Sequence, residues 1–496
     1  MFNRRDFLKA AGLLAFSPAG RVRPGPQAPG LLVNDVHSQL NPTRVDRIVS
    51  ADSLETIRMT LRRAQRDGKA ISIAGGRHAM GGQQFGLDAV LLDMRPLNRV
   101  LHLDAEKGLV EVEAGIQWPQ LVDWLLTAQV GRTRQWGIAQ KQTGADRLSL
   151  GGGLAANVHG RGLTMKPMIS DVEAFDLIDA SGEARRCSRS ENPELFRLCV
   201  GGYGLFGAVT SVRLRLTPRQ KVERIVEILT VNDLMSAFQR RIADGFLYGD
   251  FQFAINEKSE DFLRKGVFSC YRPVDPATPV PANQRELSEQ DWERLLYLAH
   301  TNREEAFQAY ARHYLATSGQ IYWSDTHQMS TYLDDYHKAL DRRLGTTDRA
   351  TEMITEIYVP REALAGLLNA VRDDFRQNGV ELIYGTVRLI EPDKESFLAW
   401  ARQPYACVIF NLHVVHTVGG LARAAAAFRR LIDLGIERGG SYYLTYHRYA
   451  TREQVLACYP QFPEFLRLKR KYDPRERFQS DWYRHYKTMF ADELTD

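Results

Sequence analysis

Cysteine is scarce in this sequence, and its spacing argues against a disulfide framework or a thiolate metal site. The five thiols form no Cys-x-x-Cys pair, and an odd number cannot pair completely within one chain. Small thiol side chains of this kind are usually buried. We therefore expect mostly buried free thiols at Cys187, Cys199, Cys270, Cys407 and Cys458.

A strong net charge and long apolar runs are also missing. The 496 residues carry 65 Lys and Arg against 60 Asp and Glu, and no basic tract is interleaved with aromatics, so we expect no nucleic-acid partner. No run approaches the roughly 20 apolar residues of a transmembrane helix, so we expect no stable membrane span after export. With 44% hydrophobic residues, the composition is typical of a globular protein of two or more domains.

The N-terminus predicts export. Residues Asn3–Lys9, NRRDFLK, are typical of a twin-arginine signal, and the short apolar run Ala10–Phe16 follows. The alternative is an ordinary helix start with two chance arginines. Residues 17–30 are rich in Pro and Gly and indicate a linker. Residues 1–30 are therefore expected to be signal and linker, and the protein to be periplasmic or otherwise exported by the twin-arginine route.

Three glycine-rich stretches dominate the N-terminal half. The apolar strand pattern Ala70–Ala74 ends in Gly75–Gly82, GGRHAMGG, and is followed later by Ser149–Gly162, SLGGGLAANVHGRG, and Gly201–Gly207, GGYGLFG. Glycines after a strand let backbone amides approach a phosphate closely. One such cluster could equally be a plain turn. Three of them indicate one large cofactor that carries phosphate.

The patterns between these stretches alternate between helix and strand. Asp52 is expected to cap a helix that runs to about Asp67, before the first glycine stretch. The third stretch precedes a strand and not the helix of a dinucleotide fingerprint, so no nicotinamide site is expected. The connection 131–147 lacks periodicity and is expected to be a functional loop. Further strands are expected at 90–94, 99–104, 109–114, 172–178 and 208–216, and a helix at 116–128.

The order and content of these motifs resemble the vanillyl-alcohol oxidase, or PCMH, type of FAD-binding flavoprotein. Members include cytokinin dehydrogenases, aldonolactone and alditol oxidases, and decaprenylphosphoryl-ribose oxidases. The resemblance covers Asn41–Pro218 well and the last 45 or so residues moderately. The stretch from His78 to Gln83 looks most like cytokinin dehydrogenases, whereas Tyr459–Phe478 resembles lactone and decaprenyl-ribose oxidases.

The resemblance implies an α+β fold of two domains. An FAD-binding domain of two α/β subdomains is expected at 35–217, and a mixed-sheet substrate, or cap, domain at 218–449. The last segment, 450–496, is expected to return to the FAD domain. Composition shifts after Pro218 toward more charge and more aromatics, with helix patterns at 306–314 and 361–378 and a strand pattern at 407–415.

The resemblance also implies which residues bind FAD. In many members the histidine of the first glycine loop is bonded to the flavin 8α-methyl group, which predicts covalent FAD through His78. The alternative is a hydrogen-bonded loop histidine with noncovalent FAD. No cysteine lies between Gly131 and Lys166, so a single attachment is expected. The cofactor-binding residues expected are Ala74, Gly75, Gly76, Arg77, His78, Ala79, Gly81, Gln83, Ser149, Gly152, Gly153, Asn157, His159, Gly207 and Val209.

Catalytic candidates come from the C-terminal half. Lactone and alditol oxidases use an acid, an arginine two positions later, and a lysine nearer the C-terminus. Here Thr386 replaces the acid, Arg388 matches the arginine, and the lysine's place falls on Tyr446, followed by His447. The predicted catalytic residues are therefore Arg388, Tyr446 and His447. The alternatives are a surface ion pair for Arg388 and interdomain packing for the run Tyr446–Tyr449.

Two further pairs carry weaker signals. His413 and His416 lie on an apolar strand without an evident carboxylate neighbour, so they are interpreted as core or edge histidines and no metal site is predicted. Glu356 and Tyr358 lie on a strand pattern from which they could line a pocket.

The function predicted is that of an exported FAD-dependent oxidoreductase with a small-molecule substrate. Hydride would pass from an alcohol-type substrate, such as a sugar, an aldonolactone or a related hydroxyl compound, to flavin N5. Either O2 or another acceptor would reoxidise the flavin. The alternatives are an amine dehydrogenase of the cytokinin dehydrogenase type, a flavin-dependent C=C reductase of the sterol-reductase type, and a non-catalytic flavin-binding protein.

Overall fold

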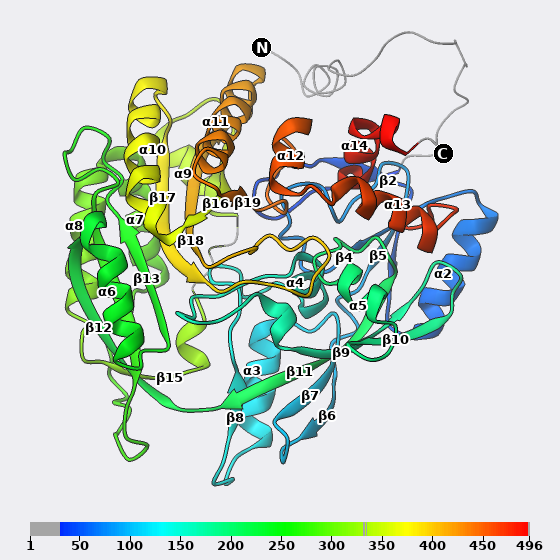
Figure 1. Ribbon diagram of the computed structural model, residues 1–496, viewed down its shortest axis with the longest axis horizontal. Coiled ribbons are helices and arrows are strands. Elements are labelled where there is room, and N and C mark those ends of the chain that lie inside the picture. The colour runs from blue at the N-terminus through cyan, green and yellow to red at the C-terminus, as the bar shows by residue number, and fades with distance from the viewer. Residues whose placement is uncertain (1–29, 331–332, 334, 495–496) are drawn as a thin grey trace.

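The computed structural model describes residues 30–330, 333 and 335–494. The predicted export signal and nearly all of its linker lie outside the described residues. Helices and strands are mixed along the chain, which confirms the predicted α+β class. The described strands form three larger sheets and the short antiparallel pair β1 (Leu31–Val33) and β2 (Thr43–Val45), arranged as Figure 1 shows. The division into two domains stays a prediction.

The first larger sheet is parallel and follows from the β-α-β start of the sequence. Its strand order is β3-β5-β4, and helix α2 connects β3 to β4. One face of α2 buries Ile57, Leu61 and Ala64, spaced as an amphipathic helix requires. The elements are β3 (Arg47–Ser50), α2 (Leu54–Arg66), β4 (Ile71–Ala74) and β5 (Val90–Asp93).

The predicted helix cap at Asp52 is wrong by one residue. Ser53 is the N-cap, and its side chain accepts a hydrogen bond from the Thr56 amide at 3.1 Å. The Asp52 carboxylate instead accepts from the Thr56 hydroxyl at 2.7 Å. Both residue types cap helices well, so the sequence alone does not separate them.

The second sheet is antiparallel and carries the other two glycine stretches on its connections. Its order is β10-β9-β11-β7-β6, and β8 pairs with the end of β11. Strand β8 lies inside the connection 131–147 that sequence analysis left without secondary structure. The strands are β6 (Val100–Asp104), β7 (Leu109–Glu113), β8 (Trp136–Ile138), β9 (Val172–Ile178), β10 (Ala184–Ser188) and β11 (Ala208–Pro218), with helices α3 (Trp118–Ala128), α4 (Leu150–Ala156) and α5 (Pro193–Cys199).

The third sheet contains eight antiparallel strands in the order β15-β12-β14-β13-β17-β18-β16-β19. Successive side chains of a strand point to opposite faces. Phe410 of β18 therefore packs on Phe375 of helix α10, whereas its neighbours Ile409 and Asn411 face the cavity described below. The strands are β12 (Lys221–Thr230), β13 (Tyr248–Phe253), β14 (Lys265–Pro273), β15 (Ile321–Trp323), β16 (Ala350–Pro360), β17 (Leu382–Ile390), β18 (Tyr405–Val415) and β19 (Ser441–Tyr442).

Helices cover both faces of this sheet. Helix α10 contacts α6 and α11 on one face, and the α7–α8 hairpin packs against the other, where it lines the cavity. The predicted helices at 306–314 and 361–378 correspond to α8 and α10. The helices are α6 (Val231–Ala243), α7 (Glu289–Thr301), α8 (Arg303–Leu315), α9 (Tyr336–Leu344), α10 (Leu364–Asn378) and α11 (Val418–Ile436).

The last helices return to the first sheet. The Ile71 amide donates to Arg477 O at 2.7 Å, and the Gln479 amide donates to Ile71 O at 2.8 Å, so residues 477–479 extend the edge of β4. Figure 1 shows these red and orange helices beside the blue N-terminal strands. They are α12 (Arg452–Cys458), α13 (Phe462–Tyr472) and α14 (Asp481–Met489).

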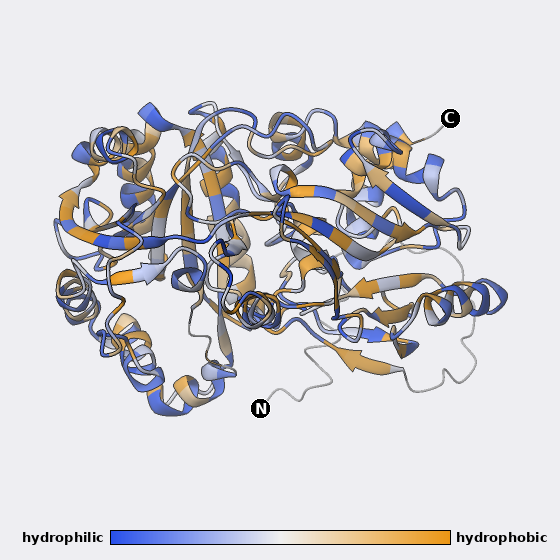
Figure 2. Ribbon diagram, turned by 90° about the horizontal axis from the view of Figure 1, so that it is seen from below, coloured by the Kyte–Doolittle hydropathy of each residue, from blue (hydrophilic) through white to orange (hydrophobic). Residues whose placement is uncertain are grey.

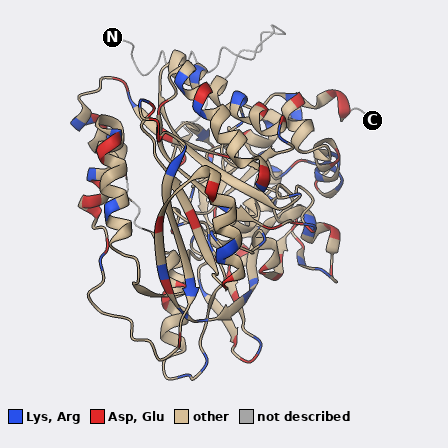
Figure 3. Cartoon of the chain, turned by 60° about the vertical axis from the view of Figure 1, so that its left-hand side comes forward, with Lys and Arg blue, Asp and Glu red and all other residues tan. Residues whose placement is uncertain are grey.

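The interior and the surface agree with the composition. All five cysteines are buried and free, as predicted, and burial raises the pKa of Cys187 to about 12. Figure 2 shows hydrophobic and hydrophilic residues interleaved along the strands and helices, and Figure 3 shows both charge signs interspersed over the chain. Within the described residues no helix has both the length and the apolar character needed to cross a membrane.

Candidate active site

One cavity of about 940 Å³ lies where the glycine stretches meet the eight-stranded sheet. Gly76, Gly152 and Gly207, one from each stretch, all line it. Its volume falls within the range of roughly 300–1,000 Å³ that cofactor and small-molecule sites occupy. The three glycine stretches therefore converge on a single site.

Bare backbone forms the wall where the first two stretches meet. A Cβ atom at Gly75 would collide with Ser149 Oγ, and one at Gly76 would collide with the Arg147 carbonyl. At Gly204 there is room for a Cβ atom, because the nearest atom that it would meet is Ile73 Cβ at 4.0 Å. Gly204 has a φ of +73° and follows Tyr203, which has a φ of +54°. This cradle of glycines fits a phosphate-bearing group.

His78 lies on this wall in a form suited to act as a nucleophile. Its side chain is buried, its ring is hydrogen-bonded to the Arg147 backbone, and its ring centroid lies 6.0 Å from that of His37. Burial, and next the neighbouring His37, lower the pKa of His78 to about 3. The imidazole is therefore neutral at neutral pH.

The polar centre of the cavity is the carboxylate of Glu356 on β16. Its Oε1 accepts a hydrogen bond from the Tyr446 hydroxyl at 2.6 Å, and its Oε2 accepts from the Tyr358 hydroxyl at 2.7 Å. His159 Nε2 lies 2.9 Å from the same Oε2. Burial alone would raise the pKa of Glu356, but His159 and the two hydroxyls outweigh it and hold the pKa at about 2. Glu356 is therefore ionised.

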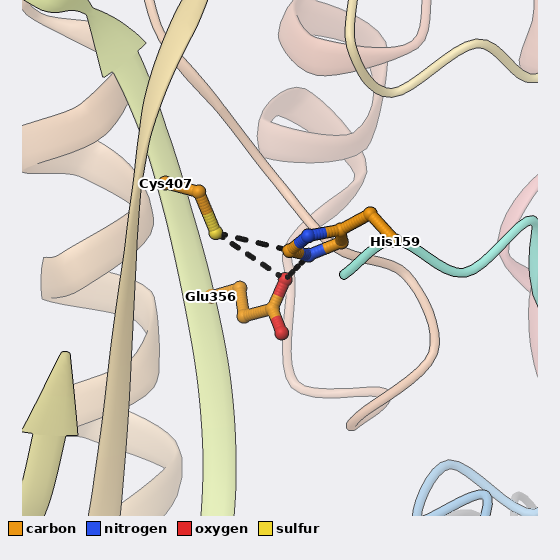
Figure 4. Close-up of side chains that lie close together, drawn as sticks. All are labelled: His159, Glu356 and Cys407. Carbon is orange, nitrogen blue, oxygen red and sulfur yellow. Dashed lines mark hydrogen bonds and ion pairs between the residues drawn. The ribbon is translucent and has the colours of Figure 1, made fainter. Parts of the chain in front are cut away.

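His159 contacts this carboxylate on one side and a backbone carbonyl on the other. Its Nδ1 lies 3.1 Å from Gly160 O, and its Nε2 lies 2.9 Å from Glu356 Oε2. Figure 4 shows Glu356 and Cys407 projecting from neighbouring strands toward the His159 ring. Burial raises the pKa of Cys407 well above its usual value, so its thiol stays neutral.

Comparisons with known proteins assign the segment that carries the first two glycine stretches. Residues 45–188 match the family model described as an FAD binding domain. The chain carries an FAD-binding domain of the PCMH type and is an FAD-dependent oxidoreductase. Some relatives align over most of the chain and others over less than half of it, all at low identity, so the matches support the FAD-binding domain and the cofactor more closely than the substrate.

Three relatives illustrate the range. The chain is 25% identical over 458 residues to L-gulono-1,4-lactone dehydrogenase of Mycobacterium tuberculosis, which covers 89% of this chain and 95% of that protein. It is 22% identical over 466 residues to decaprenylphosphoryl-beta-D-ribose oxidase of Mycolicibacterium smegmatis, at 90% and 96% coverage. It is 25% identical over 444 residues to cytokinin dehydrogenase 5 of Oryza sativa subsp. japonica, at 82% and 80% coverage.

Most of the predicted FAD-binding residues line the cavity of this oxidoreductase. Five do not: Ala74, Gly81, Gly153, Asn157 and His159. The lining residues are Gly75, Gly76, Arg77, His78, Ala79, Gln83, Ser149, Gly152, Gly207 and Val209.

Asn157 shapes the cavity wall from behind. It is fully buried with a left-handed φ of +50°, its amide nitrogen donates to Asp393 Oδ2 at 2.9 Å, and its Oδ1 accepts from the Ile169 amide. His159 acts through Glu356, as described above. Gly81 supports the first loop, because its amide donates to Gln83 Oε1 at 3.0 Å.

The three predicted catalytic residues separate into two that line the cavity and one that does not. Arg388 and Tyr446 line it. Arg388 is buried, and its Nε and Nη1 make no hydrogen bond to any described residue. His447 is buried outside the cavity, where its Nε2 lies 3.1 Å from Thr355 Oγ1 and its ring centroid lies 4.5 Å from that of Phe428, with the two rings tilted by 30°. Its surroundings are those of a packing residue.

The part of the cavity beside the α7–α8 hairpin was not found from the sequence. Arg161 and Arg224 line it together with Asp250, whose carboxylate lies 3.8 Å from Arg161. Arg224 lies over the ring of Tyr322 at 4.6 Å. No local motif marks these residues, because the cavity surface draws them from separate strands and from the loop after α4. Other lining residues here are Trp292, Phe307, Tyr310, Tyr314 and Tyr384.

Proposed function

We propose that this flavoprotein oxidises the carbon of an alcohol-type substrate, a sugar, an aldonolactone or a related hydroxyl compound. The observation that carries the proposal is the ionised Glu356 carboxylate, which accepts a hydrogen bond from the hydroxyl of Tyr446, a residue that lines the same cavity. Bound FAD supplies the hydride acceptor and is reoxidised by O2 or another acceptor. The lactone and ribose relatives support a hydroxyl substrate.

Tyr446 and Glu356 form a path for the hydroxyl proton. A substrate oxygen beside Tyr446 Oη passes its proton to that oxygen while the tyrosine proton moves to Glu356 Oε1, 2.6 Å away. A hydroxyl becomes strongly acidic as its carbon loses hydride, so a carboxylate of low pKa is an adequate acceptor. Positioned proton transfer of this kind contributes about 10²–10⁴-fold to rate.

Arg388 provides fixed positive charge in the same cavity. Arg388 lines the cavity, and its Nε and Nη1 are buried and make no hydrogen bond to any described residue. Donors that are already oriented stabilise negative charge without reorganisation. We assign Arg388 to the stabilisation of negative charge that develops during the reaction.

Covalent attachment and export complete the proposal. The buried, neutral His78 on the glycine wall supports attachment of the flavin through its imidazole. The twin-arginine pattern at Asn3–Lys9 supports export, by a route that carries folded proteins with their cofactor. A covalent bond prevents loss of flavin after export.

An amine substrate is the second candidate. An ionised carboxylate lining the cavity can pair with an ammonium group, and the cytokinin dehydrogenase relative supports that substrate class. The experiment is anaerobic mixing with panels of sugars, lactones, alcohols and amines, followed by flavin absorbance near 450 nm. Bleaching by a hydroxyl compound supports the proposal. Bleaching only by amines would instead indicate an amine dehydrogenase, and bleaching only by a nicotinamide donor would indicate a C=C reductase. The absence of bleaching with every compound would favour a flavin-binding protein without catalytic activity.

The role of Glu356 is tested by measuring the rate of flavin reduction with the compound that bleaches the flavin in that experiment. Glu356→Gln keeps the shape of the side chain but removes the proton acceptor, so flavin reduction should slow by about 10²–10⁴-fold. Glu464→Gln, on the exposed surface of α13, is the matched control and should leave the rate unchanged. A Glu356→Gln rate within a few fold of wild type would contradict the proton path.

A further inference from the structure

A second cluster of ionisable side chains surrounds Glu352, four residues before Glu356 on β16. His300 Nε2 lies 3.2 Å and His413 Nδ1 lies 3.5 Å from the same oxygen, Glu352 Oε1. The side chain of His300 is 5% exposed, that of Glu352 is 3% exposed and that of His413 is 12% exposed. The prediction that His413 has no carboxylate neighbour is therefore wrong.

Three elements bring these side chains together. Glu352 and His413 are directly opposite each other in the antiparallel pairing of β16 with β18, so they project from the same face. His300 comes from the last turn of α7, which packs over that face. The two imidazole rings are nearly perpendicular, at 81°, with centroids 4.8 Å apart. His416, the other histidine of the pair, bonds instead to Thr351 Oγ1 at 2.8 Å.

The separations match the edges of a tetrahedral metal site. Zinc binds histidine nitrogen and carboxylate oxygen at about 2.0–2.2 Å, so two ligands of one tetrahedral ion lie roughly 3.3–3.5 Å apart. The observed separations are 3.2 and 3.5 Å, and all three ligand atoms lie within 4.8 Å of one another. Two histidines and one glutamate also form one of the known zinc ligand sets, with a fourth position for water.

The contacts around the cluster favour a cation at Oε1. The other carboxylate oxygen of Glu352, Oε2, accepts a hydrogen bond from the Tyr336 hydroxyl, and this bond orients the carboxylate. His413 Nδ1 is buried and lies near Oε1 without the geometry of a hydrogen bond. His300 also lines a surface cleft of about 600 Å³, which gives an ion an entry path. Arg303 in that cleft is paired with Glu257 at 2.6 Å.

We propose that His300, Glu352 and His413 bind one divalent transition-metal ion of the zinc class. Such an ion joins α7 to the β16–β18 pair. Leu295, Leu296 and Ala299 of α7 line the large cavity, so the ion fixes one wall of the substrate region from behind. The site is independent of the proposed reaction, because none of its three ligands lines that cavity.

The test uses the full-length, flavin-loaded protein without an affinity tag. The protein is dialysed against EDTA, desalted and titrated with ZnCl2 by calorimetry, with metal content measured after a second desalting step. We expect about one equivalent of zinc and a higher melting temperature in its presence. His300→Asn, His413→Asn and Glu352→Gln should each weaken zinc binding by more than the roughly 10–100-fold that loss of an outer-shell partner causes.

One control variant and the wild-type titration keep the test decisive. His102→Asn removes a histidine from the exposed surface of β6 and should bind zinc as wild type does. The wild-type titration alone can overturn the proposal, whether or not the variants fold. It is overturned if wild type holds no stoichiometric zinc and its melting temperature does not change, or if folded His300→Asn and His413→Asn proteins retain wild-type affinity. None of these measurements depends on substrate turnover, so their failure is distinct from failure of the proposed function.

Discussion

Tyr446→Phe separates a catalytic hydroxyl from one that only supports the carboxylate. Tyr446 lines the cavity, and the substitution removes its hydroxyl, which donates to Glu356 Oε1 at 2.6 Å. Tyr358→Phe is a matched control, because the Tyr358 hydroxyl donates to Glu356 Oε2 at 2.7 Å but does not line the cavity. Both variants therefore lose one hydrogen bond to the same carboxylate.

The two variants should lose similar stability and differ in rate. A hydrogen bond to a charged group contributes about 1.5–3 kcal/mol, so each variant should lose unfolding free energy in that range. Only Tyr446→Phe interrupts the proposed proton path, so only that variant should slow flavin reduction by about 10²–10⁴-fold. The rates come from anaerobic stopped-flow absorbance, and the free energies from urea unfolding.

Two outcomes would refute this reasoning. If both variants slow flavin reduction equally, Tyr446 acts only by holding Glu356 in place, and the hydroxyl takes no part in proton transfer. If neither variant slows it by more than a few fold, the cluster around Glu356 is packing. The second outcome corresponds to the alternative that the run Tyr446–Tyr449 serves interdomain contact.

Four further predictions concern the cavity and the residues packed around it. His78→Ala should leave the acid-precipitated pellet colourless and release FAD into the supernatant, and a yellow pellet would locate the attachment elsewhere. Arg388→Ala should slow flavin reduction about 10²–10³-fold with little loss of stability, because its Nε and Nη1 have no described partners to lose; an unchanged rate would exclude its role. His447→Phe should lower the melting temperature and leave the rate within a few fold. Because Glu356 has a pKa of about 2 when folded and 4.5 ordinarily, about 3 kcal/mol of stability present above pH 4.5 should disappear as the pH falls toward 2. Urea unfolding at pH values from 6 to 2.5 checks this, because the unfolding free energy should fall less steeply with decreasing pH in Glu356→Gln than in the wild type.

The glycine wall was predictable because its signals are local. A strand, its glycine turn and the following residues are contiguous, so residues 70–84 and 149–162 were found as units. The helix cap at Ser53 was missed because neighbouring Asp and Ser compete for one position. Strand β8 was missed because its three residues, WGI, are too few to show the alternation of apolar and polar residues that distinguishes a strand from a loop.

The Glu356 cluster was not predictable in the same way. Its members come from a loop after α4, from β16, from β18 and from the loop after β19, and only the pairing of strands brings them together. Arg388 and Tyr446 were found by resemblance of short segments, whereas Glu356 was a weak signal on a strand pattern. Glu352 was missed because its partner His413 is directly opposite only after β16 and β18 pair.

The extension of β4 by residues 477–479 ties the first sheet to a distant part of the chain. The first glycine loop is held from the same part, since Gln83 Nε2 donates to Thr445 O at 2.9 Å and the Trp482 amide donates to Gly82 O at 3.4 Å. The loop next to the cavity therefore depends on residues that lie about 360–400 positions later in the sequence. We expect a chain truncated before residue 477 to lose these contacts and to be isolated without flavin.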